Sequence, residues 1–134
     1  MNIRLYDHKD YPEILNLLSA CGVEPPVEAS DLSGVCLVSE EDGKVIGCVW
    51  ALTGASTQAH IDYFAVDKDY REKHVGWLLI MAMDSVLKKL GVKRYTFFIE
   101  PDNEYFNGIM TRFGEANNVK RLRDLRFYRR EITG

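Results

Sequence analysis

A charged loop between two apolar segments is the part of this sequence best suited to binding an anion. The loop runs from Asp67 to Lys73, directly after the mostly apolar stretch Ile61 to Val66. The segment after the loop has apolar residues at helical spacing, namely Val75, Leu78, Leu79, Met83, Val86, Leu87 and Leu90. The pattern therefore predicts a strand, a polar loop and the start of a helix, in that order.

The start of a helix attracts anions. Its first N–H groups have no partner within the helix, and the helix dipole favours negative charge there. Arg71 and Lys73 flank this junction and would add positive charge. We therefore expect an anion site at the junction. The alternative is an ordinary solvated loop that joins a buried strand to an amphipathic helix.

The composition is that of a folded protein with one core. The 134 residues are 46% hydrophobic and 28% charged, which predicts a single domain over residues 1–134 and excludes a disordered chain. No apolar run reaches the ~20 residues of a membrane span, and the first residues do not resemble a signal peptide, so we expect a cytoplasmic protein without membrane contact. Cys21, Cys36 and Cys48 are scattered and odd in number, which favours reduced thiols over disulfides or a metal site.

Charge is distributed unevenly along the chain, although the net charge is only −3. Residues 1–62 carry ten Asp and Glu against three Lys and Arg, a net charge of −7, and residues 63–134 carry ten against fourteen, a net charge of +4. A basic half suits a polyanionic ligand and an acidic half suits a cationic one. Solvated charge without a partner is the alternative.

The residue patterns on either side of this loop predict a series of strands and helices, with three consecutive strands before the loop. Alternating and β-branched residues predict strands over Asn2 to Tyr6, Val35 to Ser39, Val45 to Thr53, Gln58 to Val66 and Lys93 to Ile99. Besides the helix after the loop, cap residues and apolar stripes predict one helix from Asp7 or Asp10 to Gly22 and another from Asp102 or Asn103 to Gly114. Residues 23–33 predict a loop or a broken short helix.

The C-terminal stretch is basic, and Lys120 to Ile132 predicts one or two final strands. Its basic residues are Lys120, Arg121, Arg123, Arg126, Arg129 and Arg130. Such a cluster can contact phosphates, but the whole chain is acidic and shows no nucleic-acid-binding module, so we do not expect a nucleic acid partner. We favour a charged outer face of the last strands, or an edge for self-association that would give a homodimer.

The loop resembles the pyrophosphate loop of the GNAT family of N-acetyltransferases, whose pattern is Gln/Arg-x-x-Gly-x-Gly/Ala after a strand. Here it is Arg71-Glu72-Lys73-His74-Val75-Gly76, in which Arg71 and Gly76 match and His74 stands at the first glycine. The order of predicted elements is also that of the family, so the resemblance covers essentially the whole chain. It implies an α/β (α+β) fold with a mixed, mostly antiparallel sheet, helices on both faces, and a slot where the fourth and fifth strands splay apart.

By this resemblance the chain would bind acetyl-coenzyme A. Backbone groups of Phe64, Ala65 and Val66 would pair with the pantetheine arm. The backbone N–H groups of the six loop residues, Arg71, Glu72, Lys73, His74, Val75 and Gly76, would hold the pyrophosphate. Because backbone groups do the binding, a histidine at position 74 can be accommodated. If that position needs a positive φ, histidine costs about 1 kcal/mol relative to glycine.

A second family motif is only partly present. The family often has Asn-x-x-Ala-x-x-x-Tyr-x-x-x-Gly-Phe, in which Asn contacts the cofactor and Tyr protonates the leaving thiolate. Asn103 and Gly114 match, which implies a cofactor contact for Asn103. Phe106 replaces the alanine, Met110 replaces the tyrosine and Glu115 replaces the last phenylalanine. Methionine cannot donate a proton, so the usual general acid is missing.

The resemblance also suggests a catalytic base. Aligning the predicted strand Gln58 to Val66 with histone-acetylating members puts His60 where they carry a glutamate base. Histidine is the side chain that ordinarily changes charge near neutral pH, which suits it to deprotonating an ammonium group. Asp62, two residues on, would share a strand face with His60 unless a bulge intervenes, and could orient it or attract a cationic substrate. The alternative is a half-exposed histidine without a chemical role.

Together these features predict an acyl-coenzyme-A-dependent N-acetyltransferase acting on a primary amine of a small molecule or peptide. The amine would attack the thioester carbonyl directly, and the N–H of Val66 or a neighbour would polarise that carbonyl. Glu24, Glu28 and Asp31 lie in the loop that covers the acceptor site in this family, which favours a cationic amine. The alternative is a coenzyme-A-binding or regulatory module of the same fold that has lost turnover.

Overall fold

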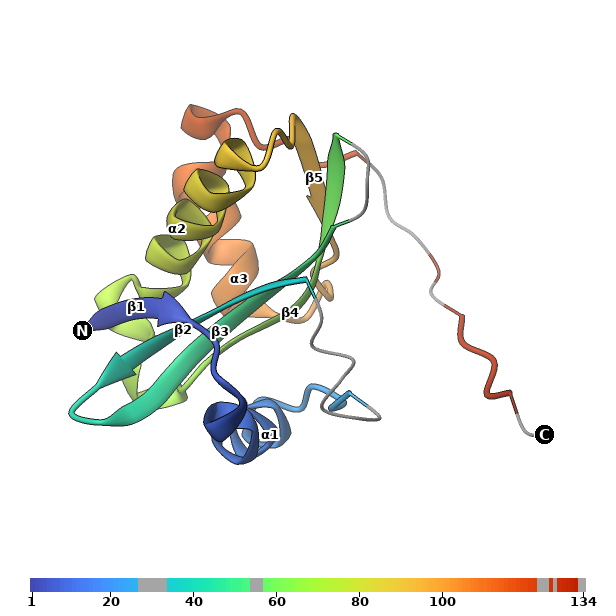
Figure 1. The fold of residues 1–134 in the computed structure, drawn as a ribbon. Helices are drawn as coiled ribbons and strands as arrows, with labels where there is room; N and C mark the ends of the chain where they lie inside the picture. The colour runs from blue at the N-terminus through green and yellow to red at the C-terminus, as the bar shows by residue number, and fades with distance from the viewer. Residues whose placement is uncertain (27–33, 54–56, 123–125, 127, 133–134) are drawn as a thin grey trace.

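A five-stranded sheet in the order β1-β2-β3-β4-β5 forms the centre of the computed structural model (Figure 1), which describes residues 1–26, 34–53, 57–122, 126 and 128–132. The strands are β1 (Asn2–Leu5), β2 (Val35–Glu41), β3 (Lys44–Thr53), β4 (Gln58–Val66) and β5 (Arg94–Phe97). Neighbouring strands pair antiparallel except β4 and β5, which pair in parallel. The expected mixed, mostly antiparallel sheet is confirmed.

Helices cover both faces of the sheet, as expected. One face carries α1 (Tyr11–Ala20), whose Ile14, Leu17 and Leu18 form a buried cluster with side chains of β2, β3 and β4. The other face carries α2 (Val75–Lys89) and α3 (Glu104–Ile109), and Figure 1 shows these two helices side by side. We refer to the two sides as the α1 face and the α2 face.

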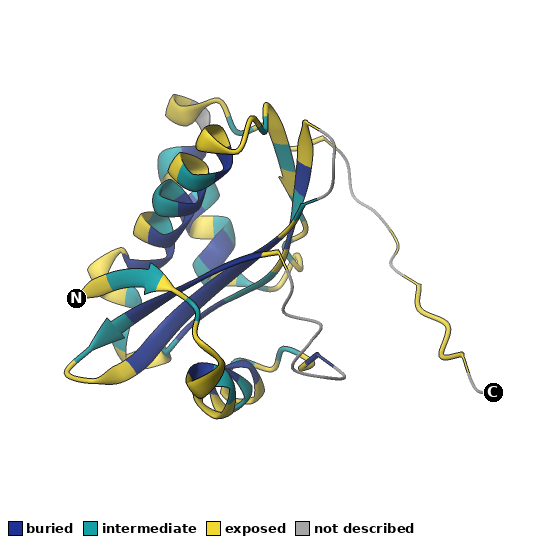
Figure 2. Cartoon of the chain, viewed as in Figure 1, coloured by how far each residue is buried: buried dark blue, intermediate teal, exposed yellow. Residues whose placement is uncertain are grey.

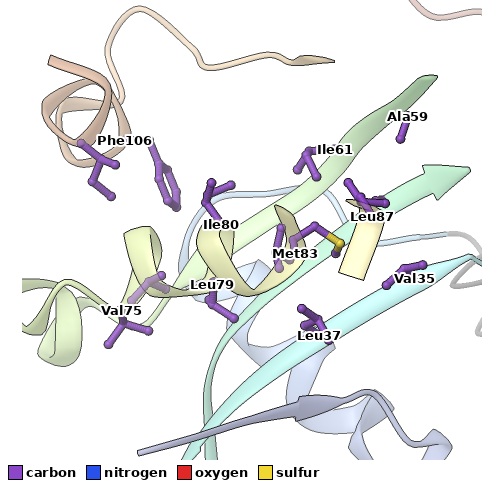
Figure 3. Close-up of a cluster of buried hydrophobic side chains, with 14 of the residues drawn as sticks. Val35, Leu37, Ala59, Ile61, Val75, Leu79, Ile80, Met83, Leu87 and Phe106 are labelled. Carbon is purple, nitrogen blue, oxygen red and sulfur yellow. The ribbon is translucent and has the colours of Figure 1, made fainter. Parts of the chain in front are cut away.

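The larger core lies between α2 and the sheet. Figure 3 shows Leu79 and Met83 of α2 between Ile61 of β4 and Leu37 of β2, and all four residues are buried. Figure 2 shows that burial is deepest along β2, β3 and β4, whereas β1 and β5 at the two edges are more exposed. Apolar spacing along α2 therefore fixes which side of that helix meets the sheet.

The segment before α2 differs from the expected loop. It forms a 3₁₀ helix over Lys68–Lys73, and the side chain of Asp67 caps this helix by accepting a hydrogen bond from the N–H of Asp69. His74 then takes a left-handed conformation, with φ 59° and ψ 23°, and is the N-cap of α2. A non-glycine residue in this conformation is strained. Position 74 therefore has the positive φ for which the sequence predicts a cost of histidine relative to glycine.

The prediction of final strands over Lys120 to Ile132 is wrong for the residues of that stretch that the structure describes. Residues 120–122, 126 and 128–132 carry no strand, and Leu122, Tyr128 and Ile132 are 77%, 80% and 85% exposed. Strand-forming residues need a neighbouring strand for their backbone groups, and pattern alone does not supply one. The loop or broken short helix predicted for residues 23–33 lies mostly outside the described residues.

Among the residues that the structure describes, no helix has both the length and the apolar character that a membrane span requires.

The entrance to α1 is fixed by a buried carboxylate. Asp10 is 3% exposed and accepts hydrogen bonds from the guanidinium of Arg4 at 2.8 and 2.9 Å and from the N–H of Asp7. Arg4 also donates to Glu40 of β2 at 2.8 Å. Hydrogen bonds from Arg4, more than any other cause, hold the pKa of Asp10 below its ordinary value. The pair thereby ties β1 and β2 to the start of α1.

We predict that Arg4→Met lowers the free energy of unfolding at neutral pH by about 3 kcal/mol, because it leaves the buried Asp10 carboxylate unpaired. A depressed carboxyl pKa stabilises the fold above the ordinary value of 3.8, and that contribution is lost as pH falls through the lower folded-state value. The difference in the free energy of unfolding between wild type and Arg4→Met should therefore become smaller at acid pH. Urea denaturation at neutral pH and near pH 3 measures both effects.

Lys44→Met is the matched control, because the ion pair of Lys44 with Asp67 leaves the lysine side chain 59% exposed. We expect a loss below about 1 kcal/mol for this exposed pair. Equal losses in the two variants, or a difference for Arg4→Met that does not change with pH, would contradict the role given to Asp10.

A second prediction concerns the strained N-cap of α2. His74→Gly should raise the free energy of unfolding by about 1 kcal/mol, because glycine adopts a positive φ without strain. His74→Ala is the control: it keeps the strain and loses the edge-on contact of the imidazole with Phe113, at 5.7 Å between ring centres, so it should be less stable than wild type. Chemical denaturation of wild type and the two variants measures these free energies of unfolding. A His74→Ala variant more stable than His74→Gly would contradict the backbone strain proposed at position 74.

Candidate functional site

The edge of β4 that faces β5 is paired over only part of its length. Gln58 to Ile61 pair with Arg94 to Phe97, whereas β4 continues to Val66. On its other side β4 pairs with β3 from Ala59 to Val66. Backbone groups of alternate residues along the second half of β4, the stretch that includes Phe64, Ala65 and Val66, therefore face a region that no strand of the described chain fills. This is the splayed slot expected between the fourth and fifth strands.

A bulge in β4 falls at Asp62, one of the two residues expected to share a strand face. Tyr63 lies opposite Trp50 and Ile61 lies opposite Ala51, so Asp62 is an extra residue without a partner on β3. His60 lies opposite Leu52, which shares the α1 face with Trp50. Tyr63 therefore joins His60 on the α1 face, and alternation no longer places Asp62 there.

The hydrogen-bond partner found for His60 is Thr96 and not Asp62. Nδ1 of His60 lies 2.9 Å from Oγ1 of Thr96, which occupies the directly opposed position on β5. The ring of Phe98 packs against the imidazole, with 4.8 Å between ring centres. His60 is thus held from β5, next to the point where β4 and β5 part.

The two cations expected at the anion site are both engaged within the protein. Arg71 donates from Nε to the carbonyl of Val66 at 3.1 Å, and its guanidinium lies 5.0 Å from the centre of the Tyr105 ring. Lys73 lies 3.8 Å from a carboxylate oxygen of Glu41. Arg71 therefore joins the end of β4 to α3, and its positive charge stays beside the start of α2.

The backbone at the start of α2 has the geometry of an anion cradle. A 3₁₀ turn that ends at Lys73 is followed by the left-handed His74 and then by the helix, and this helical-to-left-handed order turns successive N–H groups towards one concave side. The cap residue makes no side-chain hydrogen bond to the helix, which leaves the cap position open to an external acceptor.

Tyr105 occupies part of this cradle. Its hydroxyl accepts a hydrogen bond from the N–H of Gly76 at 3.1 Å. Position 76 has no room for a side chain, because a Cβ there would lie 2.8 Å from both the Tyr105 hydroxyl and Cδ1 of Ile109. Burial, the largest cause, raises the pKa of Tyr105, so its hydroxyl keeps its proton at neutral pH.

A pocket of about 260 Å³ opens between the start of α2 and α3. Its walls combine basic, acidic and apolar side chains from both elements: Arg71, Glu72, His74, Glu104, Tyr105, Gly108, Ile109, Arg112 and Phe113. Two arginines beside a cradle of N–H groups suit an anionic ligand, with Glu72 and Glu104 as the opposing charges.

α3 brings the second motif against β4. Asn103 caps α3 by accepting a hydrogen bond from the N–H of Phe106 at 3.1 Å. The Phe106 ring lies 4.0 Å from that of Phe64, centre to centre, and Phe106 is 5% exposed. From Met110 to Gly114 the helix continues as a π-helix. The amide oxygen of Asn103 is thus committed to the helix, and Phe106 fills the space beside β4 that an alanine would leave open.

Sequence reasoning missed Thr96, Tyr105 and Arg112 as members of the site. Thr96 is identified only by the parallel register that sets it opposite His60, which no local pattern encodes. Tyr105 carries a weak signal, since it lies two residues after the cap Asn103 and beside the position where the family has a small residue. Arg112 carries no signal beyond its charge.

The comparisons with known proteins agree with this geometry. The model of the acetyltransferase (GNAT) family matches residues 4–114. Similar solved structures include the aminoglycoside N-acetyltransferase AAC(6')-Iy in complex with CoA, with a TM-score of 0.75 and 15% identity over 98% of this chain and 100% of that one. The ribosomal-protein-alanine N-acetyltransferase from Brucella melitensis biovar Abortus 2308 gives a TM-score of 0.73 and 17% identity over 98% and 100%. Ard1 from Thermoplasma volcanium gives 0.74 and 23% over 84% and 80%.

No curated protein matches the sequence. At identities below 25%, the solved structures show a shared fold and leave the substrate of this chain open. The family model covers most of the chain, including the loop from Arg71 to Gly76 and the cap Asn103. The chain therefore belongs to the GNAT family of acetyltransferases.

Proposed function

We propose that this protein is an N-acetyltransferase that moves an acetyl group from acetyl-coenzyme A to a primary amine. The observation that carries the proposal is the unpaired edge of β4 beside the N-terminus of α2. It offers backbone groups for an amide-containing arm and a cradle for a diphosphate, as coenzyme A requires. Acetyl-coenzyme A, when bound, supplies the acetyl group as a reactive thioester, and coenzyme A would leave as the thiol.

The cofactor would be held mainly by backbone groups. We assign the edge of β4 at Phe64, Ala65 and Val66 to the pantetheine arm, in the manner of an added strand. The loop from Arg71 to Gly76 takes the pyrophosphate. Arg71 and Arg112 at the rim of the pocket add positive charge on the same side. Asn103 contributes by fixing the start of α3.

His60 would serve as the base that takes a proton from the ammonium form of the acceptor, directly or through one water. The free amine can then attack the thioester carbonyl, and the N–H of Val66 or a neighbour would stabilise the negative charge that develops on the carbonyl oxygen. Asp62 remains a candidate for attracting the cationic acceptor, because it is exposed at the bulge.

The acceptor is proposed to be a cationic amine. Glu24 is exposed at the start of the loop that leads to β2, while Glu28 and Asp31 lie outside the described residues. Glu24 forms an ion pair with Arg129. This carboxylate therefore already binds a cationic group of the same chain. Relatives of this fold include enzymes named for aminoglycosides and for a ribosomal-protein alanine, which are both amine acceptors.

A coenzyme-A-binding module without turnover is the second candidate, favoured by the side chains of α3. Phe106 packs against Phe64 with a tilted ring where the family has alanine, and Met110 stands where it has the acid tyrosine. Tyr105 cannot take over as the acid from its present position, since its hydroxyl is bound to Gly76 at the opposite end of β4 from His60. Under this alternative the cradle binds the cofactor and no acetyl group is transferred.

Calorimetry with acetyl-coenzyme A and a thiol-release assay together test the proposal. The acceptor panel should contain a polyamine, an aminoglycoside and peptides with free N-termini. We expect binding and steady release of coenzyme A with at least one amine. His60→Ala should lower turnover about 100-fold or more without changing cofactor affinity.

His8→Ala is the matched control, because His8 is an exposed histidine at the start of the chain and should leave turnover unchanged. Absence of binding at millimolar acetyl-coenzyme A would refute both candidates. Binding of acetyl-coenzyme A without release of coenzyme A for any amine of the panel would support the binding module over the enzyme.

A further prediction tests the position of Tyr105. Tyr105→Phe should tighten the binding of acetyl-coenzyme A about fivefold, because the Gly76 N–H then needs no exchange of partner when a phosphate oxygen arrives. Tyr95→Phe is the control, since that hydroxyl binds Asp84, outside the pocket. Titration calorimetry measures both, and weaker binding by Tyr105→Phe would mean that the hydroxyl donates to the ligand.

A further inference from the structure

We propose that Thr96 is a positioning residue that keeps His60 in the tautomer with hydrogen on Nδ1, so that Nε2 carries the lone pair that accepts a proton. The proposal rests on the function proposed above, in which His60 is the base, and it adds a residue that neither family motif contains. It is carried by the 2.9 Å contact between Nδ1 of His60 and Oγ1 of Thr96.

The strand register makes this contact a property of the fold. His60 and Thr96 are directly opposed in the parallel pairing of β4 with β5, one position before the last pair, Ile61 and Phe97. Directly opposed residues in neighbouring strands point to the same face. The hydroxyl is therefore presented to the imidazole by the two backbones and does not depend on a long, mobile side chain.

A threonine hydroxyl can either donate to Nδ1 or accept from it, and the role of base requires that it accept. A neutral imidazole has one nitrogen with hydrogen and one with a lone pair. If Thr96 accepted no hydrogen and instead donated to Nδ1, Nε2 would carry the hydrogen and could not remove a proton from an amine. With Nδ1–H donating to Thr96 Oγ1, the lone pair lies on Nε2, and the same hydrogen bond persists after Nε2 has gained its proton.

The surroundings of His60 limit other orientations of the ring. Phe98 packs on the imidazole at 4.8 Å between ring centres, and Leu52 lies opposite His60 on β3. A half-turn of the ring would exchange Nδ1 for a carbon at Thr96 and lose the 2.9 Å contact. A hydrogen bond to the other nitrogen is commonly what sets the reactive nitrogen of a functional histidine.

The test uses three variants of the full chain. Thr96→Val removes the hydroxyl and keeps a β-branched side chain suited to a strand, and Thr96→Ser restores the hydroxyl. Tyr95→Phe is the control, because it removes a neighbouring hydroxyl of β5 that binds Asp84 of α2. Nitrogen-15 NMR of the imidazole, recorded above the pH range in which histidines titrate, reports the tautomer of His60 whether or not the protein turns over.

We expect hydrogen on Nδ1 in wild type, in Thr96→Ser and in Tyr95→Phe, and a shift towards Nε2–H in Thr96→Val. Turnover in Thr96→Val should fall about tenfold or more through kcat, with unchanged affinity for acetyl-coenzyme A, and Thr96→Ser should regain most of it. Hydrogen on Nε2 in wild type would overturn the proposal, as would the same tautomer in Thr96→Val as in wild type.

The two proposals fail in different ways. If His60→Ala keeps full turnover, His60 is not the base, and the tautomer measurement still decides whether Thr96 sets the state of the ring. If His60→Ala is inactive while Thr96→Val has the wild-type kcat, His60 is the base and Thr96 does not position it.

Discussion

The parting of β4 from β5 is the constraint on which the rest of this site depends. A strand that is paired on one side only presents a row of backbone donors and acceptors on the other, and such groups seek partners. Here β4 keeps β3 along its length and loses β5 after Ile61. The start of α2 lies at one end of this open edge, and α3 packs beside it through Phe106 and Phe64. The loss of pairing with β5 therefore leaves an open backbone edge next to the N-terminus of α2.

The same parting explains why the chemical groups lie where they do. His60 is in the last paired stretch of β4, where β5 can still supply Thr96, and the bulge at Asp62 comes immediately after it. Beyond the bulge β4 pairs with β3 alone, and its other edge has no partner strand among the described residues. The histidine that we propose as the base is thus held by a neighbouring strand next to the open edge of β4, and the sheet supplies both.

Close packing at the start of α2 is the second constraint. Gly76 permits α3 to approach so near that any Cβ would collide with Ile109 and Tyr105, whereas His74 takes a left-handed conformation that glycine would adopt without cost. The chain therefore keeps glycine where space is lacking and tolerates histidine where only backbone strain opposes it. Strain at one residue, of about 1 kcal/mol, is small beside the steric overlap that a side chain at position 76 would create.

Local patterns predicted the elements of the fold well and the contacts of the site less well. The bounds of β4 and the cap of α3 by Asn103 follow from residue types and turn signals, and the unusual φ of His74 follows from the motif it interrupts. Thr96 opposite His60 depends on the register of a parallel pair joined through α2. Alternation alone placed Asp62 on the face of His60, and the bulge at Asp62, which breaks that alternation, has no local signature.

The aromatic residues of α3 decide between an enzyme and a binding module, and they differ in how firmly they are held. Phe106 is 5% exposed and belongs to the main core, so it cannot leave its place beside Phe64 without opening a cavity. Tyr105 is half-buried at the pocket wall and is held by one hydrogen bond to Gly76 and by the Arg71 guanidinium. A bound cofactor can exchange those polar contacts for its own. Phe106 is therefore a fixed side wall of the slot between β4 and β5. The pantetheine arm would pair with the backbone edge of β4, so a rigid Phe106 that narrows the slot is compatible with acetyl transfer.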